Sequence, residues 1–263
     1  MPIDSVTLSA SARTGLASIQ RSNEQSADRS RALSSGRRIN SPQDDAAAYL
    51  AAKALTDKAS DLASVKEQSA GAVSAVSAAL DGTQAVGRLV NQLQGIALSA
   101  QSTDSAAERA AYAEQYNVVR DQIGAVIQDA SYQGTSLLGG GTSISAGDVT
   151  VSAQNVTVGG LGLSAVAADG SNFGDALLAE LSSATTTLRQ AQSNLGSSVA
   201  ALNIQAGNAD NLRNVAAEAG LKLSEADLRE EAAGLAASRT RQQLSQVGLG
   251  ISRDLQNSIL SLF

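Results

Sequence analysis

The chain has 263 residues, of which 43% are apolar but only 2% aromatic, and it contains neither Cys nor His. These absences exclude Cys/His zinc sites, disulfides, cysteine nucleophiles and histidine acid–base catalysis. The formal net charge is −6, and the sequence lacks both the dense basic stripe of nucleic-acid binders and a membrane-spanning run of roughly 20 apolar residues. We expect a protein that is not an enzyme, has no cofactor or metal, and binds neither nucleic acid nor membrane.

The first 40 residues are polar and weakly patterned. The stretch 20–32 (QRSNEQSADRSRA) offers almost nothing to bury, so an isolated chain cannot offset the entropy of ordering it. We predict weak or absent order there in the free monomer. The N-terminus also lacks the charged region and apolar block of a cleaved secretory signal.

The stretch 40–45 (NSPQDD) predicts the start of a long helix, with Ser41 as N-cap and Pro42 in the first turn. Apolar residues then recur at steps of three and four for about 55 residues. The pattern shifts near Asp81-Gly82, which indicates a local bend or a change of phase.

A second helix is predicted over about 106–130. It follows a turn at 102–105, because Ser105 precedes Glu108 at the spacing of a capping box. Residues 139–174 then hold nine of the 23 glycines. Period-two alternation at 149–151, 156–158 and 161–163, with Gly159-Gly160 as a tight turn, predicts one or two short β-hairpins.

The C-terminal part carries a coiled-coil seam, in which small and apolar residues step by three and four without a break from 181 to 226. A single helix cannot bury such a seam, so we expect residues 60–100 and 181–226 to pack against each other; a standalone coiled-coil dimer is the alternative. One face of a last helix is marked by Leu244, Val247, Ile251, Leu255 and Ile259.

These elements predict a mainly α fold: a long antiparallel helical coiled-coil rod made from the N- and C-terminal segments, with a small β-hairpin insert. We expect terminal helices from 1–40 with 230–263, a rod domain from 41–138 with 175–229, and an insert at 139–174.

Three stretches match a known family. Residues 32–41 (ALSSGRRINS), with Asp44-Asp45 and Ala46-Ala47 after them, resemble the flagellin N-terminal signature. Residues 132–138 (YQGTSLL) resemble the turn that follows the second flagellin helix, and 239–263 resemble the flagellin C-terminus. The resemblance covers roughly 1–138 and 175–263 and leaves out the glycine-rich insert.

The resemblance implies a structural subunit that polymerises into the bacterial flagellar filament for swimming motility. It also implies unfolded type III export without a cleaved signal peptide, an extracellular destination, and terminal segments that order during assembly. The implied partners are further copies of the chain, hook-associated junction and cap proteins, and a flagellar export chaperone.

The residues expected to form subunit contacts lie in the signature and in the C-terminal tail. They are Leu33, Arg37, Arg38, Ile39, Asn40, Asp44, Asp45, Leu244, Val247, Ile251, Leu255, Ile259, Leu260, Leu262 and Phe263.

One position departs from flagellins that an animal Toll-like receptor senses. Those carry a helix of the LQRxREL type, with which we align 90–96 (VNQLQGI). Gln94 stands in place of the key Arg and Gly95 in place of the Glu, so we expect weak recognition by that receptor.

Three other functions stay open from the sequence. A hook–filament junction protein shares similar termini. A secreted helical adaptor and a helical enzyme that uses carboxylates or a Ser–Lys dyad come from other classes, and no convergent motif supports the enzyme.

Overall fold

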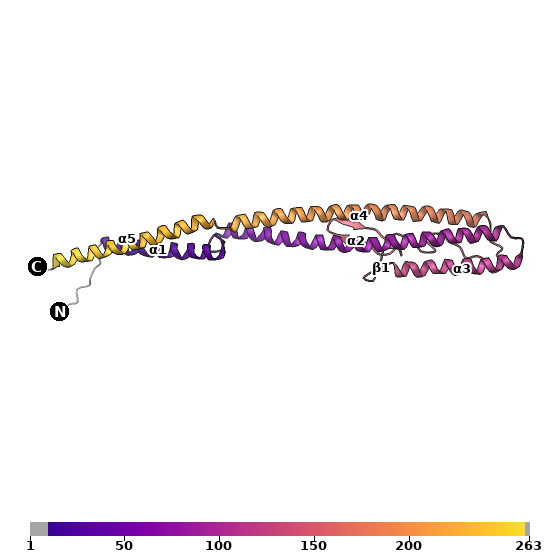
Figure 1. Ribbon diagram of the computed structural model, residues 1–263, viewed down its shortest axis with the longest axis horizontal. Coiled ribbons are helices and arrows are strands. Elements are labelled where there is room, and N and C mark those ends of the chain that lie inside the picture. The colour runs from indigo at the N-terminus through magenta and orange to yellow at the C-terminus, as the bar shows by residue number, and fades with distance from the viewer. Residues whose placement is uncertain (1–9, 261–263) are drawn as a thin grey trace. The chain divides into compact units, whose positions relative to one another are not determined.

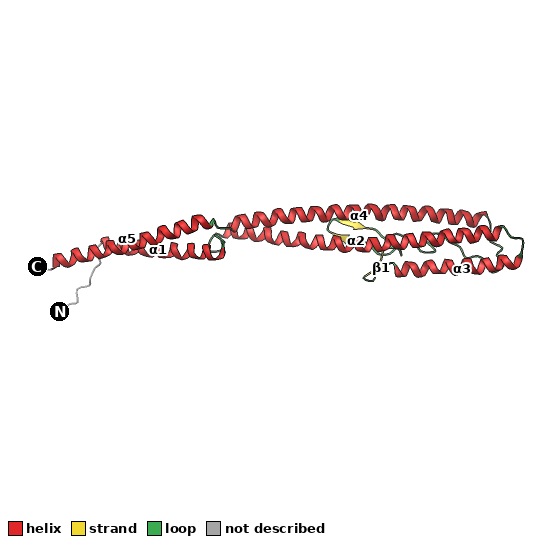
Figure 2. Cartoon of the chain, viewed as in Figure 1, coloured by secondary structure: helices red, strands yellow, loops and turns green. Residues whose placement is uncertain are grey.

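The computed structural model describes residues 10–260, with the side chains at 10–12, 252, 255–257, 259 and 260 excepted. It confirms a mainly α protein with a small β component (Figures 1 and 2). The elements in chain order are α1 (Ala10–Ser35), α2 (Ala46–Gln101), α3 (Ala106–Asp129), β1 (Ser131–Tyr132), β2 (Thr135–Ser136), β3 (Ile144–Ala146), β4 (Val149–Val151), α4 (Asp175–Ser224) and α5 (Leu228–Leu260).

The chain forms two compact units. The terminal unit lies within Met1–Ala59 and Val215–Phe263, and the central unit comprises Ser60–Asn214. Helices α2 and α4 contribute to both. The three-part division expected from the sequence follows helix breaks and glycine content rather than compactness, and it stays a prediction about the assembled protein.

In the central unit, α2 lies between α3 and α4 in the view of Figure 1. Helices α2 and α4 are antiparallel: Lys66 Nζ meets Asp210 Oδ1 at 2.8 Å, while the later residues 84–91 share a groove with the earlier residues 185–192. The expected partnership of 60–100 with the α4 seam is thereby confirmed for this unit. The seam then has a helical partner within the same chain.

The core of the central unit is aliphatic and well buried. Its fully enclosed side chains come from all three helices and from the segment that follows α3. The largest of them are Tyr116, Leu93, Ile123, Leu137, Leu138, Leu181, Leu195, Leu202, Val76, Val86, Val90 and Val151.

The seam of α4 ends earlier than its pattern predicts. Leu195 and Leu202 are fully buried, but Leu212 is 56% exposed and Leu223 37% exposed. A straight helix has 3.6 residues per turn, so a strict heptad stripe drifts by about 20° per repeat. The prediction of an unbroken seam to 226 is therefore wrong at these two leucines.

The phase shift at Asp81-Gly82 marks a change of packing partner, since α2 continues through it without a break. A Cβ on Gly82 would lie 2.4 Å from the Cβ of Ala130 and 2.7 Å from Cδ1 of Leu138. Glycine is needed here because the end of α3 and the segment after it approach α2 closely.

The start of α3 agrees with its sequence signal. Ser105 is the N-cap, and its Oγ accepts from the N–H of Glu108 at 3.4 Å. The reciprocal half of the capping box is replaced: the Glu108 carboxylate accepts from the Thr103 hydroxyl, and Thr103 Oγ1 accepts from the Ser105 N–H at 3.2 Å.

The glycine-rich insert contains one antiparallel hairpin, β3–β4, with Ile144 opposite Val151. The hairpin expected around Gly159-Gly160 is absent among the described residues. A turn forms there instead, in which the N–H of Leu161 donates to the carbonyl of Thr157 at 2.8 Å. The alternation misled because Val156, Leu161 and Leu163 all enter the helical core, so it reports burial of one side of an extended segment.

Polar contacts fix this segment on the helices. Asn117 on α3 bonds both backbone groups of Val166, through Nδ2 at 2.8 Å and Oδ1 at 3.0 Å. Arg120 Nε donates to the carbonyl of Leu163 at 3.1 Å. The Phe173 ring meets Tyr116 edge-on, with ring centroids 5.9 Å apart. The insert is thus part of the central core.

Candidate assembly interface

The signature segment forms the connection between α1 and α2. Gly36, with φ of +69°, ends α1 in the left-handed conformation that glycine adopts without strain. Its carbonyl accepts from the N–H of Ala226 at 3.1 Å, and the N–H of Arg38 donates to the carbonyl of Ser224 at 2.8 Å. These backbone bonds tie the connection to the end of α4.

Asp44 and Asp45 each cap a different set of backbone groups. Asp44 Oδ2 accepts from the N–H of Asn40 at 2.9 Å and of Ser41 at 2.8 Å. Those two N–H groups hold the pKa of Asp44 below its ordinary value. Asp45 Oδ1 accepts from the N–H of Ala48 at 3.0 Å.

Helix α2 therefore begins at Ala46 with Asp45 in the capping position, and the prediction of Ser41 as N-cap is wrong. Residues 41–44 form a separate turn, in which the N–H of Asp44 donates to the carbonyl of Ser41 at 3.1 Å. Both residue types are good N-caps, and the choice falls to Asp45 because the turn faces back onto residue 40.

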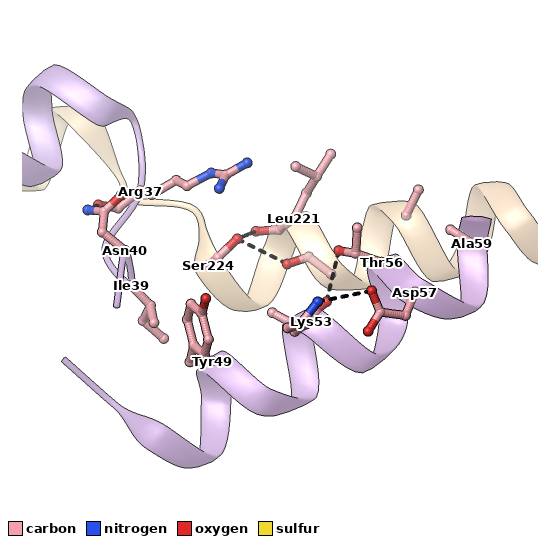
Figure 3. Close-up of a pocket in the computed structure, with 13 residues that line it drawn as sticks. Arg37, Ile39, Asn40, Tyr49, Lys53, Thr56, Asp57, Ala59, Leu221 and Ser224 are labelled. Carbon is pink, nitrogen blue, oxygen red and sulfur yellow. Dashed lines mark hydrogen bonds and ion pairs between the residues drawn. The ribbon is translucent and has the colours of Figure 1, made fainter. Parts of the chain in front are cut away.

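A groove of about 420 Å³ lies beside this connection (Figure 3). Ile39 enters it and is only 3% exposed, whereas Arg37 and Asn40 line it and are exposed. On its wall Lys53 Nζ lies 3.2 Å from Asp57 Oδ1. The groove is lined by Arg37, Ile39, Asn40, Tyr49, Ala52, Lys53, Thr56, Asp57, Ala59, Ala217, Gly220, Leu221 and Ser224.

Helices α1 and α5 lie side by side in the terminal unit (Figure 1), and small or polar residues fill much of their interface. Ser22 and Ser238 are 6% and 2% exposed, and the Ser22 hydroxyl donates to the carbonyl of Ser238 at 3.0 Å. Gln242 Nε2 donates to Asn23 Oδ1 at 2.6 Å. Leu235, 8% exposed, is the large apolar side chain that α5 buries.

The apolar stripe of α5 faces away from α1. Leu244, Val247 and Ile251 are 66%, 60% and 57% exposed. At 3.6 residues per turn, their mean direction lies about 160° around the helix from that of the α1-facing positions such as Ser238 and Gln242. The pair therefore leaves its largest aliphatic side chains without cover.

The other expected contact residues fall in two groups. Leu33 on α1 is 38% exposed. The backbone of Leu255, Ile259 and Leu260 belongs to α5, but their side chains, and Leu262 and Phe263 entirely, lie outside the described residues.

The expected receptor site lies on α2. Gly95 is exposed and Gln94 half-buried, and a Cβ on Gly95 would meet no atom within 4 Å. The exchange at these positions thus alters surface chemistry rather than packing, and weak receptor recognition stays a prediction.

Sequence reasoning missed the α1–α5 contacts. Ser22, Arg29, Glu231, Ser238 and Gln242 belong to it, and their polarity leaves no mark in an apolar pattern. The signal that was present is spacing: Glu231, Ser238 and Gln242 are separated by seven and four residues, which places them on one helical face.

Two kinds of feature are absent from the described residues. Across 10–260, no cluster of three or more His, Cys, Asp or Glu residues has the arrangement of a metal site. None of the helices, within their described extent, has both the length and the apolarity to cross a membrane.

The comparisons with known proteins identify the family. Residues 4–143, slightly more than half of the chain, match the family described as bacterial flagellin N-terminal helical region. The chain belongs to the bacterial flagellin family.

Curated relatives extend the similarity over the full length. The chain is 27% identical over 273 aligned positions to flagellin FljM and 25% identical to flagellin FljK, both of Caulobacter vibrioides, with all of each chain covered. It is 31% identical over 109 positions to flagellin E of Vibrio cholerae serotype O1, which covers 41% of this chain and 29% of the relative. These flagellins favour a filament subunit over a hook–filament junction protein.

Proposed function

We propose that this structural subunit of the bacterial flagellar filament polymerises through the exposed apolar stripe of α5, formed by Leu244, Val247 and Ile251. The observation that carries the proposal is their exposure, between 57% and 66%, on the side of α5 opposite α1. Burying a side chain of this size contributes about 1.5–3 kcal/mol, so three of them supply a substantial drive for association.

The connection at 36–45 supports the same role. It is fixed by backbone bonds and by the Asp44 carboxylate, yet it leaves Arg37, Arg38 and Asn40 exposed. We infer that these side chains contact neighbouring subunits, and that Leu255, Ile259, Leu260, Leu262 and Phe263 extend the stripe.

The remaining parts of the proposal concern the route to the filament. The subunit is exported unfolded without a cleaved signal peptide, is held beforehand by an export chaperone, and meets junction and cap proteins at the ends of the filament. The scarcity of buried apolar area between α1 and α5 supports this, because such a pair separates at little cost in free energy.

The test is seeded growth. We expect the triple substitution Leu244→Gln, Val247→Gln and Ile251→Gln to abolish elongation of filament fragments in electron micrographs, while circular dichroism shows an unchanged free energy of unfolding for the central unit. The matched control is Ile204→Gln, since Ile204 is an equally exposed aliphatic residue (65%) on α4.

Two results would contradict the proposal. Growth of the triple variant at the native rate would exclude the α5 stripe as an assembly surface. A native protein that stays monomeric with intact seeds would count against the filament role itself.

A further inference from the structure

An ion pair with a steric seat joins the two helices of the terminal unit. Arg29 Nη1 on α1 lies 3.2 Å from Glu231 Oε2 on α5, and the two side chains are 36% and 17% exposed. The guanidinium also fills the space above Gly234, where a Cβ would lie 1.8 Å from Nη1 and 2.3 Å from Cζ. The absence of a side chain at 234 therefore creates the seat that Arg29 occupies.

The neighbouring contacts specify the alignment of the two helices less strictly. The Ser22 hydroxyl donates to a main-chain carbonyl, that of Ser238. At the base of the pair, the N–H of Ala226 donates to the carbonyl of Gly36. Main-chain groups are the same at every residue, so equivalent bonds form in a shifted alignment.

A slip of seven residues is the natural error for two helices that meet along one face, because it restores the same stripe. A slip in one direction places Arg29 opposite Arg241 and Ser238 in place of Gly234 and Glu231. It thereby opposes two like charges and removes the seat.

A slip in the other direction places Arg29 opposite Asp227 and Ser224. Both positions precede Leu228, where α5 begins, so no helical face receives the guanidinium there. Of these three alignments, only the native one offers both a glycine seat and a carboxylate. A polar residue that is satisfied in only one alignment is a known means of fixing helix register.

We propose that Arg29, seated over Gly234 and paired with Glu231, fixes the register of α1 against α5, and that a subunit joins the filament efficiently only in this register. The inference rests on the proposed function, since it assigns a specificity role within the same helix pair. It concerns the alignment of the pair, whereas the stripe at Leu244, Val247 and Ile251 concerns contact with neighbours.

The first test exchanges the charges in the full-length protein. Arg29→Glu and Glu231→Arg alone should each slow seeded elongation about tenfold, because each leaves a partly buried charge facing a like charge. The double variant Arg29→Glu with Glu231→Arg should return to within about twofold of the native rate, since the pair is rebuilt in reverse.

The second test exploits opposite expectations for one substitution. Gly234→Ala should favour the helix by intrinsic propensity, but its methyl group displaces the guanidinium. We expect slower elongation together with unchanged or raised helix content by circular dichroism. Gly250→Ala is the matched control, because it lies on the same helix and a Cβ there meets nothing within 4 Å.

A third measurement reads the register directly. The chain has no Cys, so introduced cysteines form the only disulfides. In filaments, the pair Ser22→Cys with Ser238→Cys should cross-link, and the pair Ser22→Cys with Ser245→Cys, seven residues further along, should not. With Arg29→Glu present, the shifted pair should gain cross-linking at the expense of the native pair.

The outcomes separate the two proposals. Native-like growth of both single-charge variants, a double variant no faster than the singles, or an unchanged cross-linking ratio with Arg29→Glu would overturn the register role while leaving the filament function intact. Failure of the native protein to elongate in the same assay would instead count against the filament function.

Discussion

The two units of this chain are stabilised by different means. The central unit encloses large aliphatic side chains completely, such as Leu93, Ile123 and Leu195 at 0% exposure. The α1–α5 pair encloses serines, and it leaves its aliphatic stripe outside. Because burial of apolar surface is the main favourable contribution to folding, the central unit holds most of its stabilising contacts within itself, while the terminal pair keeps much of its apolar surface for contacts with other molecules.

The largest test of this contrast uses one substitution in both units. Leu195→Ala should lower the free energy of unfolding of the central unit by about 2–5 kcal/mol, because it leaves a cavity in a closed core. Leu244→Ala should change it by less than about 0.5 kcal/mol, since that side chain is 66% exposed, yet it should slow filament growth. Urea titration followed by circular dichroism measures the first quantity, and seeded elongation the second.

Equal stability losses for the two leucines would remove the contrast. That result would mean that Leu244 is covered in the free monomer.

A smaller effect is expected from two glycines of α2. Gly82→Ala should destabilise the central unit by about 1–3 kcal/mol, because the new methyl group overlaps Ala130 and Leu138. Gly87→Ala should stabilise it by up to about 1 kcal/mol through helix propensity alone, since a Cβ there meets nothing within 4 Å. The difference in thermal midpoint between the two variants measures both effects. Stabilisation by Gly82→Ala would show that α3 can move away from α2.

The smallest effect at neutral pH comes from Tyr116, whose buried hydroxyl has no hydrogen-bond partner. Removing an unsatisfied buried polar atom is neutral or favourable, so Tyr116→Phe should raise the free energy of unfolding of the central unit by at most about 1 kcal/mol.

The same residue gives a pH dependence of known sign. Burial, with a further contribution from the Glu180 carboxylate, raises the pKa of Tyr116 from 10.0 to about 12. The unfolded chain therefore loses this proton first. Between the two values the native protein should lose stability faster than Tyr116→Phe, by at most about 1.4 kcal/mol per pH unit. Parallel stability curves for the two proteins over this range would contradict the assigned shift.

Much of the helical framework follows from the sequence. The seam from Leu181 to Leu202 predicted a buried stripe and its partner on α2, and Ser105 predicted the start of α3. These succeed because spacing and caps are local properties that packing here does not override. The start of α2 could not be chosen locally, since Ser41 and Asp45 are both suitable caps and the deciding bonds are those of Asp44.

The assembly surface was only half predictable. Spacing placed Leu244, Val247 and Ile251 on one face, but it does not say whether that face meets α1 or the outside. The answer depends on Ser22 and Ser238, which occupy the contact by virtue of small size rather than hydrophobicity. Close approach of two helices through small residues leaves little trace in an apolar pattern.

The serine-rich contact between α1 and α5 also sets how this pair responds to temperature. The heat-capacity change of an association grows with the apolar surface it buries and is reduced by polar surface. Joining these two helices, which bury Ser22, Ser238 and a single leucine of the described part of α5 to below one-tenth exposure, should involve a small heat-capacity change. Its strength should therefore vary gently between cold and warm water, while contacts made by the aliphatic stripe strengthen on warming.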